Sequence, residues 1–393
     1  MNDKIQKRPD ITAGKHLIGR FVGDTSGPAV VVFGSLHGNE AAGALALERV
    51  ASKLGQLSLP RRGSVSLLAG NTRALLKSVR FIDSDLNRHW TPANIEKNSP
   101  GANTCSLSED KEQSELLEIL NGILAEARGE VYALDLHSTS AEGSPFATVG
   151  DTLRNRSFAQ MFPITILLGI EEQLEGTLLE YLNNRGAVTL GFEGGQHFAE
   201  STVDTHEALV WCALYNSGIL SNGEGDGIER WNSVLKEKTG LPRIVEIRYR
   251  HAITPSDDFS MRPGFNNFDP IRRGQILATD ARGDVVAPET GVILMPLYQK
   301  LGEDGFFVGR EVAPFWLRLS GLLRQMKIYR LMPILPGVRR TPDPDTLEIN
   351  TRIARLFPLQ VFHLLGYRRL RWANDRLVVT RRKFDTIGPF GKG

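Results

Sequence analysis

The sequence predicts an α/β fold in which an open, largely parallel or mixed sheet is covered by helices. A continuous β-branched run at residues 29–33 is typical of a strand buried on both faces. Between residues 29 and 216, runs of this kind alternate with segments of helical periodicity. Chemically reactive side chains stand at or just after several expected strands, where open α/β sheets bind their ligands. These three observations together predict the fold class.

The expected elements follow one another along the chain. The strand at 29–33 leads into a helix over about 40–54. A pattern resembling a capping box at 106–109 opens a second helix, whose apolar residues form one stripe and whose end fits Gly129. The remaining expected elements are strands at 64–68, 131–136, 164–168 and 187–192, and helices at 177–186 and 204–216.

Length and composition set outer limits. The 393 residues are too many for one simple core, so we expect two or three domains. The only two cysteines, Cys105 and Cys212, argue against a disulfide scaffold and against a thiolate metal site. No apolar run follows the N-terminal residues to indicate a signal peptide, and the longest apolar stretch, at 162–170, is too short to span a bilayer. We therefore expect a reduced, cytoplasmic protein with no membrane partner.

Three domains are expected. Residues 1–235 are predicted to form the α/β domain. Residues 240–312 are predicted to form a smaller β-rich domain, because a strand at 243–250 is followed by short apolar runs separated by glycines. Residues 313–393 form a basic extension with 16 Lys and Arg against 5 Asp and Glu, a net charge of +11, while the rest of the chain carries −9.

The basic extension has two interpretations. One is a surface that docks on the acidic body or on a partner subunit in a homo-oligomer. The other is attraction to nucleic acid or to anionic lipid. We favour docking, because no nucleic-acid motif accompanies the charge and because too many apolar residues run through the segment for a disordered tail. Nucleic acid is therefore not expected as a partner.

Three side chains point to a metal site. His37 and Glu40 follow the first expected strand, three residues apart, and His137 ends another strand much later in the chain. Two imidazoles and one carboxylate are the three-ligand set of a catalytic zinc, which leaves a fourth position open for water. A hydrogen-bonded loop histidine would explain His37 alone. The three residues together favour one zinc ion per chain.

Arg80, Asn87 and Arg88 lie between the two ligand segments. A guanidinium is a planar fork that matches a carboxylate bidentately and stays charged when partly buried. Asn87 offers a neutral donor for the same anion as Arg88. Ordinary ion pairs with Asp83 and Asp85 would also explain the two arginines. The predicted zinc site makes a role in anion binding the better interpretation.

Glu193 is the candidate general base. It ends an expected strand and precedes Gly194 and Gly195, which would let the chain turn sharply and leave the carboxylate in the crevice. A carboxylate beside a metal site can take a proton from water and hand it to a leaving group. The alternative is a strand-end glutamate that faces solvent.

These residues give the chain a resemblance to the succinylglutamate desuccinylase/aspartoacylase family, which is related to the zinc carboxypeptidases. The motifs occur in the family's order, up to about residue 220. They are His37-Gly38-Asn39-Glu40, Asn71-Thr72-Arg73-Ala74, Arg80 with Asp85-Leu86-Asn87-Arg88, Asp135-Leu136-His137 and Phe192-Glu193-Gly194-Gly195. The resemblance implies a zinc carboxypeptidase-like mixed sheet flanked by helices, followed by a smaller β-rich domain. The segment after about residue 313 departs from the family pattern.

The resemblance also implies a role for each candidate residue. The three metal candidates hold zinc, and Arg80 polarises the scissile carbonyl. Asn87 and Arg88 grip a substrate carboxylate, and Glu193 is the acid/base. The expected function is a zinc-dependent amidohydrolase, or deacylase, that cleaves a small N-acyl amino acid or a similar carboxylate-bearing amide. A zinc carboxypeptidase acting on peptides and a non-enzymatic binding protein of the same fold are the alternatives.

Two further residues are left open. Asp135 shares a strand face with His137, so it could support a zinc ligand from behind or serve only as a structural carboxylate. Tyr298 could reach the site from the β-rich domain, although a core tyrosine is the more ordinary interpretation.

Overall fold

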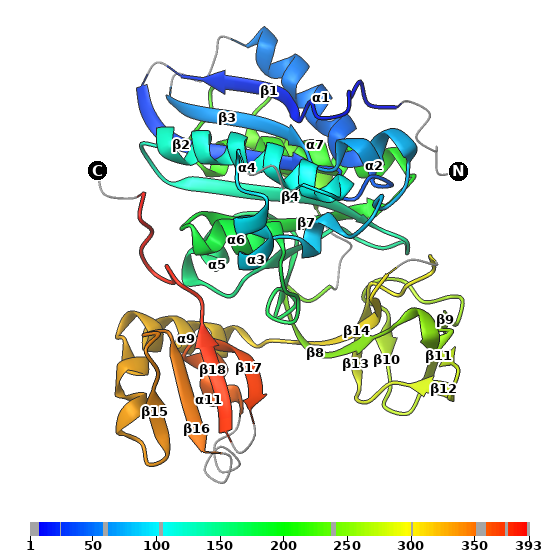
Figure 1. Ribbon diagram of the computed structural model, residues 1–393, viewed down its shortest axis with the longest axis vertical. Coiled ribbons are helices and arrows are strands. Elements are labelled where there is room, and N and C mark those ends of the chain that lie inside the picture. The colour runs from blue at the N-terminus through cyan, green and yellow to red at the C-terminus, as the bar shows by residue number, and fades with distance from the viewer. Residues whose placement is uncertain are drawn as a thin grey trace.

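A central mixed sheet of 11 strands, in the order β1-β3-β2-β4-β7-β5-β6-β8-β14-β13-β10, organises the molecule (Figure 1). The computed structural model describes residues 8–23, 25–57, 62–101, 105–236, 241–299, 302–350, 359–373 and 376–390. The strands of this sheet are β1 (Leu17–Val22), β2 (Thr25–Gly34), β3 (Arg62–Ala69), β4 (Val131–Thr139), β5 (Phe146–Val149), β6 (Thr165–Leu168), β7 (Val188–Gln196), β8 (Ile244–Ala252), β10 (Pro270–Ile271), β13 (Gly291–Leu294) and β14 (Asp304–Glu311).

Helices cover both faces of this sheet, as predicted. On one face lie α1 (Ala41–Gln56), α5 (Leu153–Ala159), α7 (Glu200–Asn216) and α8 (Ile228–Leu235), and on the other lie α4 (Ser108–Glu126) and α6 (Leu178–Asn184). The β-branched run in β2 explains this sandwich, because alternate side chains of a strand point to opposite faces. Val30 and Val32 join the apolar cluster with α1 and α7, while Val31 and Phe33 join the cluster with α4 and α6.

Parallel pairing brings the predicted reactive positions to one edge. Strand β2 runs parallel to β3 and β4, and β4 runs parallel to β7. The carboxyl ends of β2, β4 and β7 therefore lie side by side. Three short elements follow β3, the other parallel neighbour of β2: α2 (Thr72–Lys77), the 3₁₀ turn η1 (Leu86–Arg88) and α3 (Pro92–Lys97).

The expected capping box before α4 is displaced by one residue. The helix begins at Ser108, and Asp110, not Glu109, turns back to accept a hydrogen bond from the backbone N–H of Leu107 at 3.0 Å. Glu109 is drawn away because its carboxylate accepts from the backbone N–H of Ile82 at 2.8 Å. The helix also ends before Gly129. Gly129 serves packing, not the helix end: an added Cβ there would lie 2.6 Å from the backbone oxygen of Gly27.

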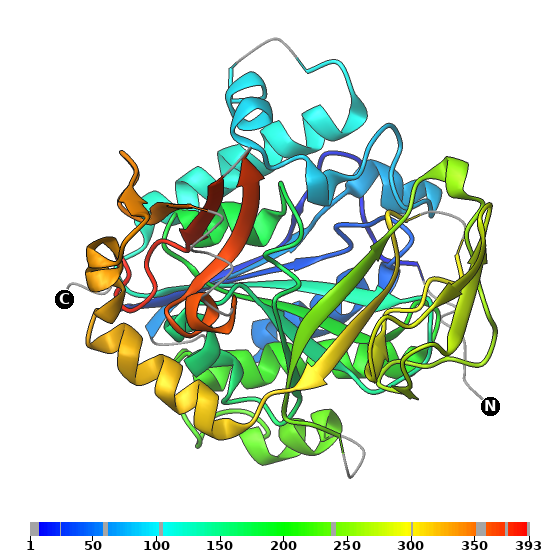
Figure 2. The same ribbon diagram turned by 90° about the horizontal axis from the view of Figure 1, so that it is seen from below.

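The central sheet continues into the region predicted to be a separate β-rich domain. Strand β8 pairs in parallel with β6, and β14, β13 and β10 extend the sheet from β8. Figure 2 shows β8 and β14 side by side, leading to the lobe that contains β10 and β13. In this lobe a second sheet contains β9 (Ser260–Met261), β11 (Ile276–Asp280) and β12 (Gly283–Val286), and the 3₁₀ turn η2 (Pro255–Asp257) precedes it.

The C-terminal residues form another lobe, on the far side of β8 and β14 from the β-rich lobe (Figures 1 and 2). Its sheet has the order β15-β16-β18-β17. Arg324, fully buried, ties this lobe to the body, because its guanidinium lies 3.0 Å from Asp151 and 3.1 Å from Asp385. The elements are α9 (Pro314–Gln325), η3 (Ile328–Ile334), β15 (Val338–Arg340), β16 (Thr346–Asn350), α11 (Leu359–Leu364), β17 (Tyr367–Ala373) and β18 (Arg376–Arg381).

The division at 235, 240 and 312 stays a prediction. Part of its first boundary, at residues 237–240, lies outside the described residues, as do 1–7 and 391–393 at the two ends. Within the described ranges, no helix has both the length and the apolar composition that a bilayer crossing requires.

Candidate active site

A cavity of about 470 Å³ opens at the carboxyl ends of β2, β4 and β7. It lies where the predicted fold should bind a ligand, at the strand ends of an open α/β sheet. Segments that are far apart in the sequence therefore line one cavity. All seven side chains predicted from the sequence line it: His37, Glu40, Arg80, Asn87, Arg88, His137 and Glu193.

The turn between β2 and α1 positions two of them. His37 lies three residues after the end of β2, and Glu40 is the N-cap residue of α1. The hydroxyl of Ser35 donates to the backbone carbonyl of Glu40 at 2.8 Å, which closes the turn. Gly38 is required between them, because a Cβ there would lie 2.2 Å from the backbone of Ala74. The turn is thus locked against α2, and both side chains point into the cavity.

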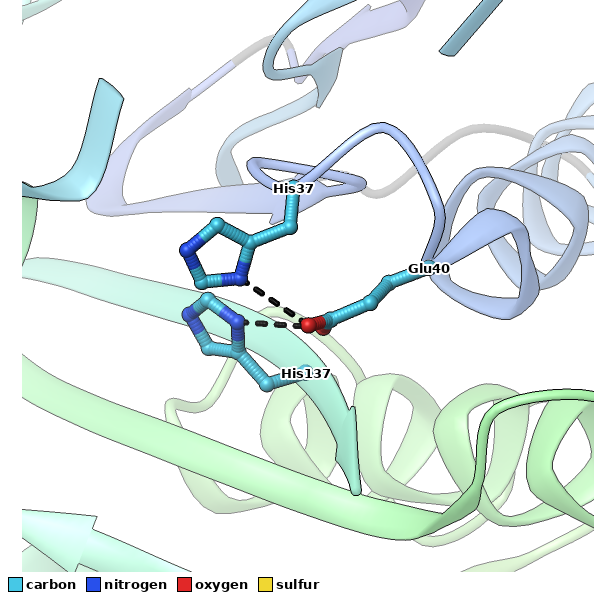
Figure 3. Close-up of side chains that lie close together, drawn as sticks. All are labelled: His37, Glu40 and His137. Atoms are coloured by element: carbon cyan, nitrogen blue, oxygen red, sulfur yellow. Dashed lines mark hydrogen bonds and ion pairs between the residues drawn. The ribbon is translucent and has the colours of Figure 1, made fainter. Parts of the chain in front are cut away.

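His37, Glu40 and His137 converge on one point (Figure 3). Nδ1 of His37 lies 2.9 Å from Oε1 of Glu40, and Nδ1 of His137 lies 3.2 Å from Oε2. One donor atom from each of the three residues falls within 4.8 Å of the other two, as the ligands of a single metal ion must. All three side chains are at least nine-tenths buried.

Carboxylates support both imidazoles from behind. Nε2 of His137 lies 2.7 Å from Asp135, and Nε2 of His37 lies 3.2 Å from Asp85. A metal-binding histidine commonly donates its second ring N–H to a carboxylate, which fixes the tautomer and leaves the other nitrogen free for the metal. The two Nδ1 atoms and the Glu40 carboxylate therefore fit a Zn²⁺ ion in both geometry and chemistry.

Charges within the set also favour a cation. Burial alone would raise the pKa of the Glu40 carboxyl, yet His37 and His137 hold that pKa well below its usual range. Burial would lower the pKa of His137, yet Asp135 and Glu40 raise it well above the usual value. The carboxylates around His137 thus favour positive charge at this point, which a bound dication would supply.

Glu193 stands next to the metal candidates. In the β4–β7 ladder its Cα is paired with that of His137. Its Oε2 is buried without a hydrogen-bond partner among the described residues. Burial raises the pKa of this carboxyl to about 8, with His137 and Arg80 acting in the opposite direction. A dication beside Glu193 would lower this raised pKa and favour the ionised form, which accepts a proton.

Gly194 and Gly195 do not make the sharp turn expected after Glu193, since β7 continues to Gln196. Gly194 is needed for packing: a Cβ there would lie 2.4 Å from the ring of His206 on α7. Nε2 of that ring lies 2.8 Å from the backbone carbonyl oxygen of His137, at hydrogen-bond distance. The glycine therefore lets α7 support the strand that carries the histidine.

The predicted anion-binding residues already have partners. A guanidinium nitrogen of Arg80 lies 3.0 Å from Asp85, and Arg88 lies 3.3 Å from Glu303 and 3.8 Å from Asp304 at the start of β14. The side-chain oxygen of Asn87 accepts from the backbone N–H of Leu178 at 3.0 Å, which orients its amide.

Several residues of the cavity were missed from the sequence. His197 is 5% exposed, and its Nδ1 lies 2.8 Å from the hydroxyl of Ser138. Glu171 follows β6, which ends beside the site, so its position after a strand was the available signal. Tyr298 is 41% exposed, so it is not a core residue, and it is not among the residues that line the cavity. Its hydroxyl hydrogen-bonds to the backbone of Phe265.

A second group of similar composition lies elsewhere. His16, Glu112 and Glu115 also place donor atoms within 4.8 Å of one another. Here, however, Arg73 lies 2.8 Å from each carboxylate, and Thr72 donates to Glu112 at 2.8 Å. Burial would raise the pKa of Glu115, yet hydrogen bonds from Arg73 and His16 lower it to about 2. The guanidinium already supplies the positive charge of this group.

Known proteins resemble this region in sequence and in fold. Residues 26–201 match the Succinylglutamate desuccinylase/Aspartoacylase catalytic domain. Aspartoacylase of Danio rerio is 27% identical over 212 residues, which are 48% of this chain and 64% of that protein. A probable aspartoacylase of Acaryochloris marina is 31% identical over 112 residues, which are 28% of this chain and 35% of that protein. The chain thus spans less than two thirds of either relative.

Solved structures show the same fold. The succinylglutamate desuccinylase/aspartoacylase of Rhodobacter sphaeroides superposes with a TM-score of 0.54 at 18% identity, over 74% of this chain and 88% of that one. The product-bound ectoine utilization protein EutE (DoeB) of Ruegeria pomeroyi gives 0.53 at 16% identity, over 73% and 87%. Residues 26–201, a little under half of the chain, thus match the catalytic domain of the succinylglutamate desuccinylase/aspartoacylase family, and the solved structures share its fold.

Proposed function

We propose that this chain is a zinc-dependent amidohydrolase that removes the acyl group from a small N-acyl amino acid or a similar carboxylate-bearing amide. The observation that carries the proposal is the meeting, in one cavity, of a three-donor metal set with a Glu193 oxygen that no described residue hydrogen-bonds. The family and the two relatives named aspartoacylase support a deacylase. We also propose that the protein acts in the cytoplasm.

The shape of the cavity supports a small substrate. Residues of the β-rich region line part of it, among them Ile253, Leu297 and Phe307. We infer that these side chains leave less room for an extended peptide than for a small amide. The peptide-cleaving alternative, a zinc carboxypeptidase, is for this reason the weaker candidate.

His37, Glu40 and His137 would hold the metal. When bound there, zinc supplies a Lewis acid and lowers the pKa of water toward neutrality. Glu193 accepts the proton of the attacking water and then gives it to the departing amine. Its buried, partnerless oxygen suits this work, because no hydrogen bond has to break before it takes the proton.

The arginines and Asn87 orient the substrate. Arg80, beside Glu40 and Asp85, donates to the oxyanion that develops on the scissile carbonyl, and such a donor is worth about 3–4 kcal/mol. Arg88 and Asn87 hold the substrate carboxylate. Glu303, the nearest carboxylate to Arg88, is largely exposed, so exchanging it for a substrate carboxylate costs little.

A metal analysis combined with an activity panel tests the proposal. The purified protein should contain near-stoichiometric zinc and hydrolyse N-acetyl or N-succinyl amino acids. A chelator should abolish this activity, and added zinc should restore it. Faster release of C-terminal residues from peptides would instead favour the carboxypeptidase. Zinc binding without hydrolysis of either class would favour a binding protein.

A further inference from the structure

An exposed apolar stripe runs along α9, the first helix of the C-terminal lobe. Four apolar residues on one side of this helix and its C-cap form the stripe: Phe315, Leu319, Leu322 and Met326. The opposite side faces the molecule, because Ser320 and Arg324 there are buried. Phe315, Leu322 and Met326 are 65%, 54% and 62% exposed. A helix of a globular protein ordinarily turns its apolar stripe to the core, so this stripe is open to a partner.

The stripe belongs to a larger apolar surface. Trp316 packs edge to face on Phe315, with ring centroids 5.2 Å apart, and η3 packs against α9. In Figure 2, α9 runs along the outer edge of the molecule. Of the 17 large apolar side chains that are exposed in the described chain, six lie within residues 315–334, and such a concentration marks an interaction site. We call these six the apolar patch: Phe315, Trp316, Leu322, Met326, Leu331 and Ile334.

The same segment carries only positive charge. Residues 313–341 contain six Lys and Arg and no Asp or Glu. Arg324 is buried between Asp151 and Asp385, and the other five cations are exposed: Arg318, Lys327, Arg330, Arg339 and Arg340. None of these five forms an ion pair with a residue in the described ranges. Their charge is therefore available to an anionic partner.

An anionic lipid surface complements both properties at once. Apolar and aromatic side chains enter the boundary between headgroups and acyl chains, while Lys and Arg stay at the level of the anionic headgroups. A twofold contact between two copies of this chain would instead bring the same cations of both copies together. Nucleic acid would pair with the cations but would leave the aliphatic side chains of the patch without a partner.

We propose that the C-terminal lobe docks on a membrane surface rich in anionic phospholipid, with the apolar patch inserted and the five exposed cations facing the headgroups. Docking of this kind needs no bilayer-spanning segment, so it revises the expectation of no membrane partner only for the membrane surface. No residue of the patch is among the described residues that line the active-site cavity. Docking and hydrolysis can therefore be measured separately, and the proposal does not depend on the deacylase function.

Vesicle binding tests the proposal on the full-length protein. Co-sedimentation with vesicles of phosphatidylcholine and phosphatidylserine, mixed three to one, is compared with vesicles of phosphatidylcholine alone. Binding to the anionic vesicles should be at least about tenfold tighter and should weaken as salt is added. Brominated acyl chains should quench the tryptophan emission of the bound protein, and Trp316→Phe should remove most of this quenching. No binding to either vesicle, or equal binding to both, would overturn the proposal.

The contribution of charge is measured with a matched pair of variants. Arg318→Gln combined with Arg330→Gln should weaken binding to the anionic vesicles about 25-fold, because each Lys or Arg near such a surface contributes a factor of about five. Arg272→Gln combined with Arg273→Gln removes the same charge from exposed positions of the β-rich lobe and should have little effect. An equal loss in both variants would mean that the overall charge, not the C-terminal lobe, attracts the vesicle.

The contribution of the patch is measured in the same way. Phe315→Ser combined with Leu322→Ser should weaken binding at least about tenfold, since two apolar side chains no longer enter the bilayer. Leu76→Ser combined with Met161→Ser alters exposed apolar residues elsewhere and should not. Circular dichroism checks the fold, and if the patch variant is unfolded, the charge variants and the unaltered protein decide.

Two other occupants of the patch would be recognised by these variants. Light scattering would reveal a dimer that Phe315→Ser with Leu322→Ser converts to a monomer, without any vesicle binding, if the patch joins two copies of the chain. Duplex DNA bound more tightly than the vesicles, with an affinity that this variant leaves unchanged, would assign the cations to nucleic acid. Either result would overturn the membrane proposal.

Discussion

The two histidine–carboxylate groups of this molecule have nearly the same donors and opposite surroundings. His37, Glu40 and His137 line a cavity, whereas His16 is 1% exposed and packs with its two glutamates beside Arg73. In the first group Arg80 lies 3.0 Å from Nε2 of His37 but 3.7 Å from the Glu40 carboxylate. In the second group, Arg73 lies 2.8 Å from both carboxylates.

The difference teaches that a donor set alone does not define a metal site. A carboxylate pair that already holds a guanidinium gains little from a dication, because its negative charge is compensated. The first group opens on a cavity, and its carboxylate has imidazole nitrogens, not a guanidinium, at hydrogen-bond distance. Four experiments test this contrast.

Removal of a ligand should have the largest effect. His37→Ala and His137→Ala should each lose nearly all bound zinc and with it the activity, because two remaining donors cannot hold the ion. The matched change in the other group, His16→Ala, should keep the zinc. Elemental analysis of the purified variants measures this. Full zinc retention in both cavity variants would disprove the metal assignment.

The base should have the next largest effect. Glu193→Gln keeps the shape of the side chain and removes the proton acceptor, so turnover should fall about 10²–10⁴-fold while zinc is retained. Glu115→Gln, a similar change in the second group, should leave turnover close to that of the parent. Steady-state kinetics with parallel zinc analysis decides, and near-normal turnover of Glu193→Gln would exclude it as the base.

Substrate charge is tested through Arg88. Arg88→Ala should lower kcat/KM for free-acid substrates about 10- to 150-fold, the equivalent of about 1.5–3 kcal/mol, because a charge-assisted contact is lost. The corresponding methyl esters lack the carboxylate and should change much less. The paired measurement on acid and ester is its own control. An equal loss for both would mean that Arg88 does not bind the carboxylate.

The carboxylate behind His137 should have the smallest effect. Asp135→Asn keeps the size of the side chain but weakens the support of the imidazole, so zinc affinity should drop about 10- to 100-fold. Competition with a chelator of known affinity measures the change. In the second group, Glu112→Gln should leave zinc affinity unaltered. An unchanged affinity in Asp135→Asn would make Asp135 a structural residue only.

Sequence reasoning succeeded where the signal was local or strictly periodic. The β-branched run predicted β2, and parallel pairing then placed His37, His137 and Glu193 at one edge of the sheet. It failed where a distant partner decides. Asp110 caps α4 because the Glu109 carboxylate instead accepts a hydrogen bond from the backbone of Ile82. Gly194, after Glu193, leaves room for the packing of α7. Neither constraint is visible within a few residues of the motif.

The cavity residues that were missed have the same origin. Glu171 looks like any polar residue after a strand, and its setting depends on Arg382, more than two hundred positions later in the chain. The clustering of these residues follows from tertiary packing, and neither spacing nor periodicity encodes it.

The continuity of the central sheet limits how the cavity can exchange its contents. Strands β6 and β8 are hydrogen-bonded neighbours, with Leu167 opposite Val245 and Leu168 opposite Glu246. The wall that carries Glu171 and the wall that carries Phe307 are thus parts of one backbone frame. A hinge between them would have to break ladder hydrogen bonds at every turnover. This frame favours a fixed aperture over a swinging lid, so the rim, not a closing motion, would set the largest molecule admitted.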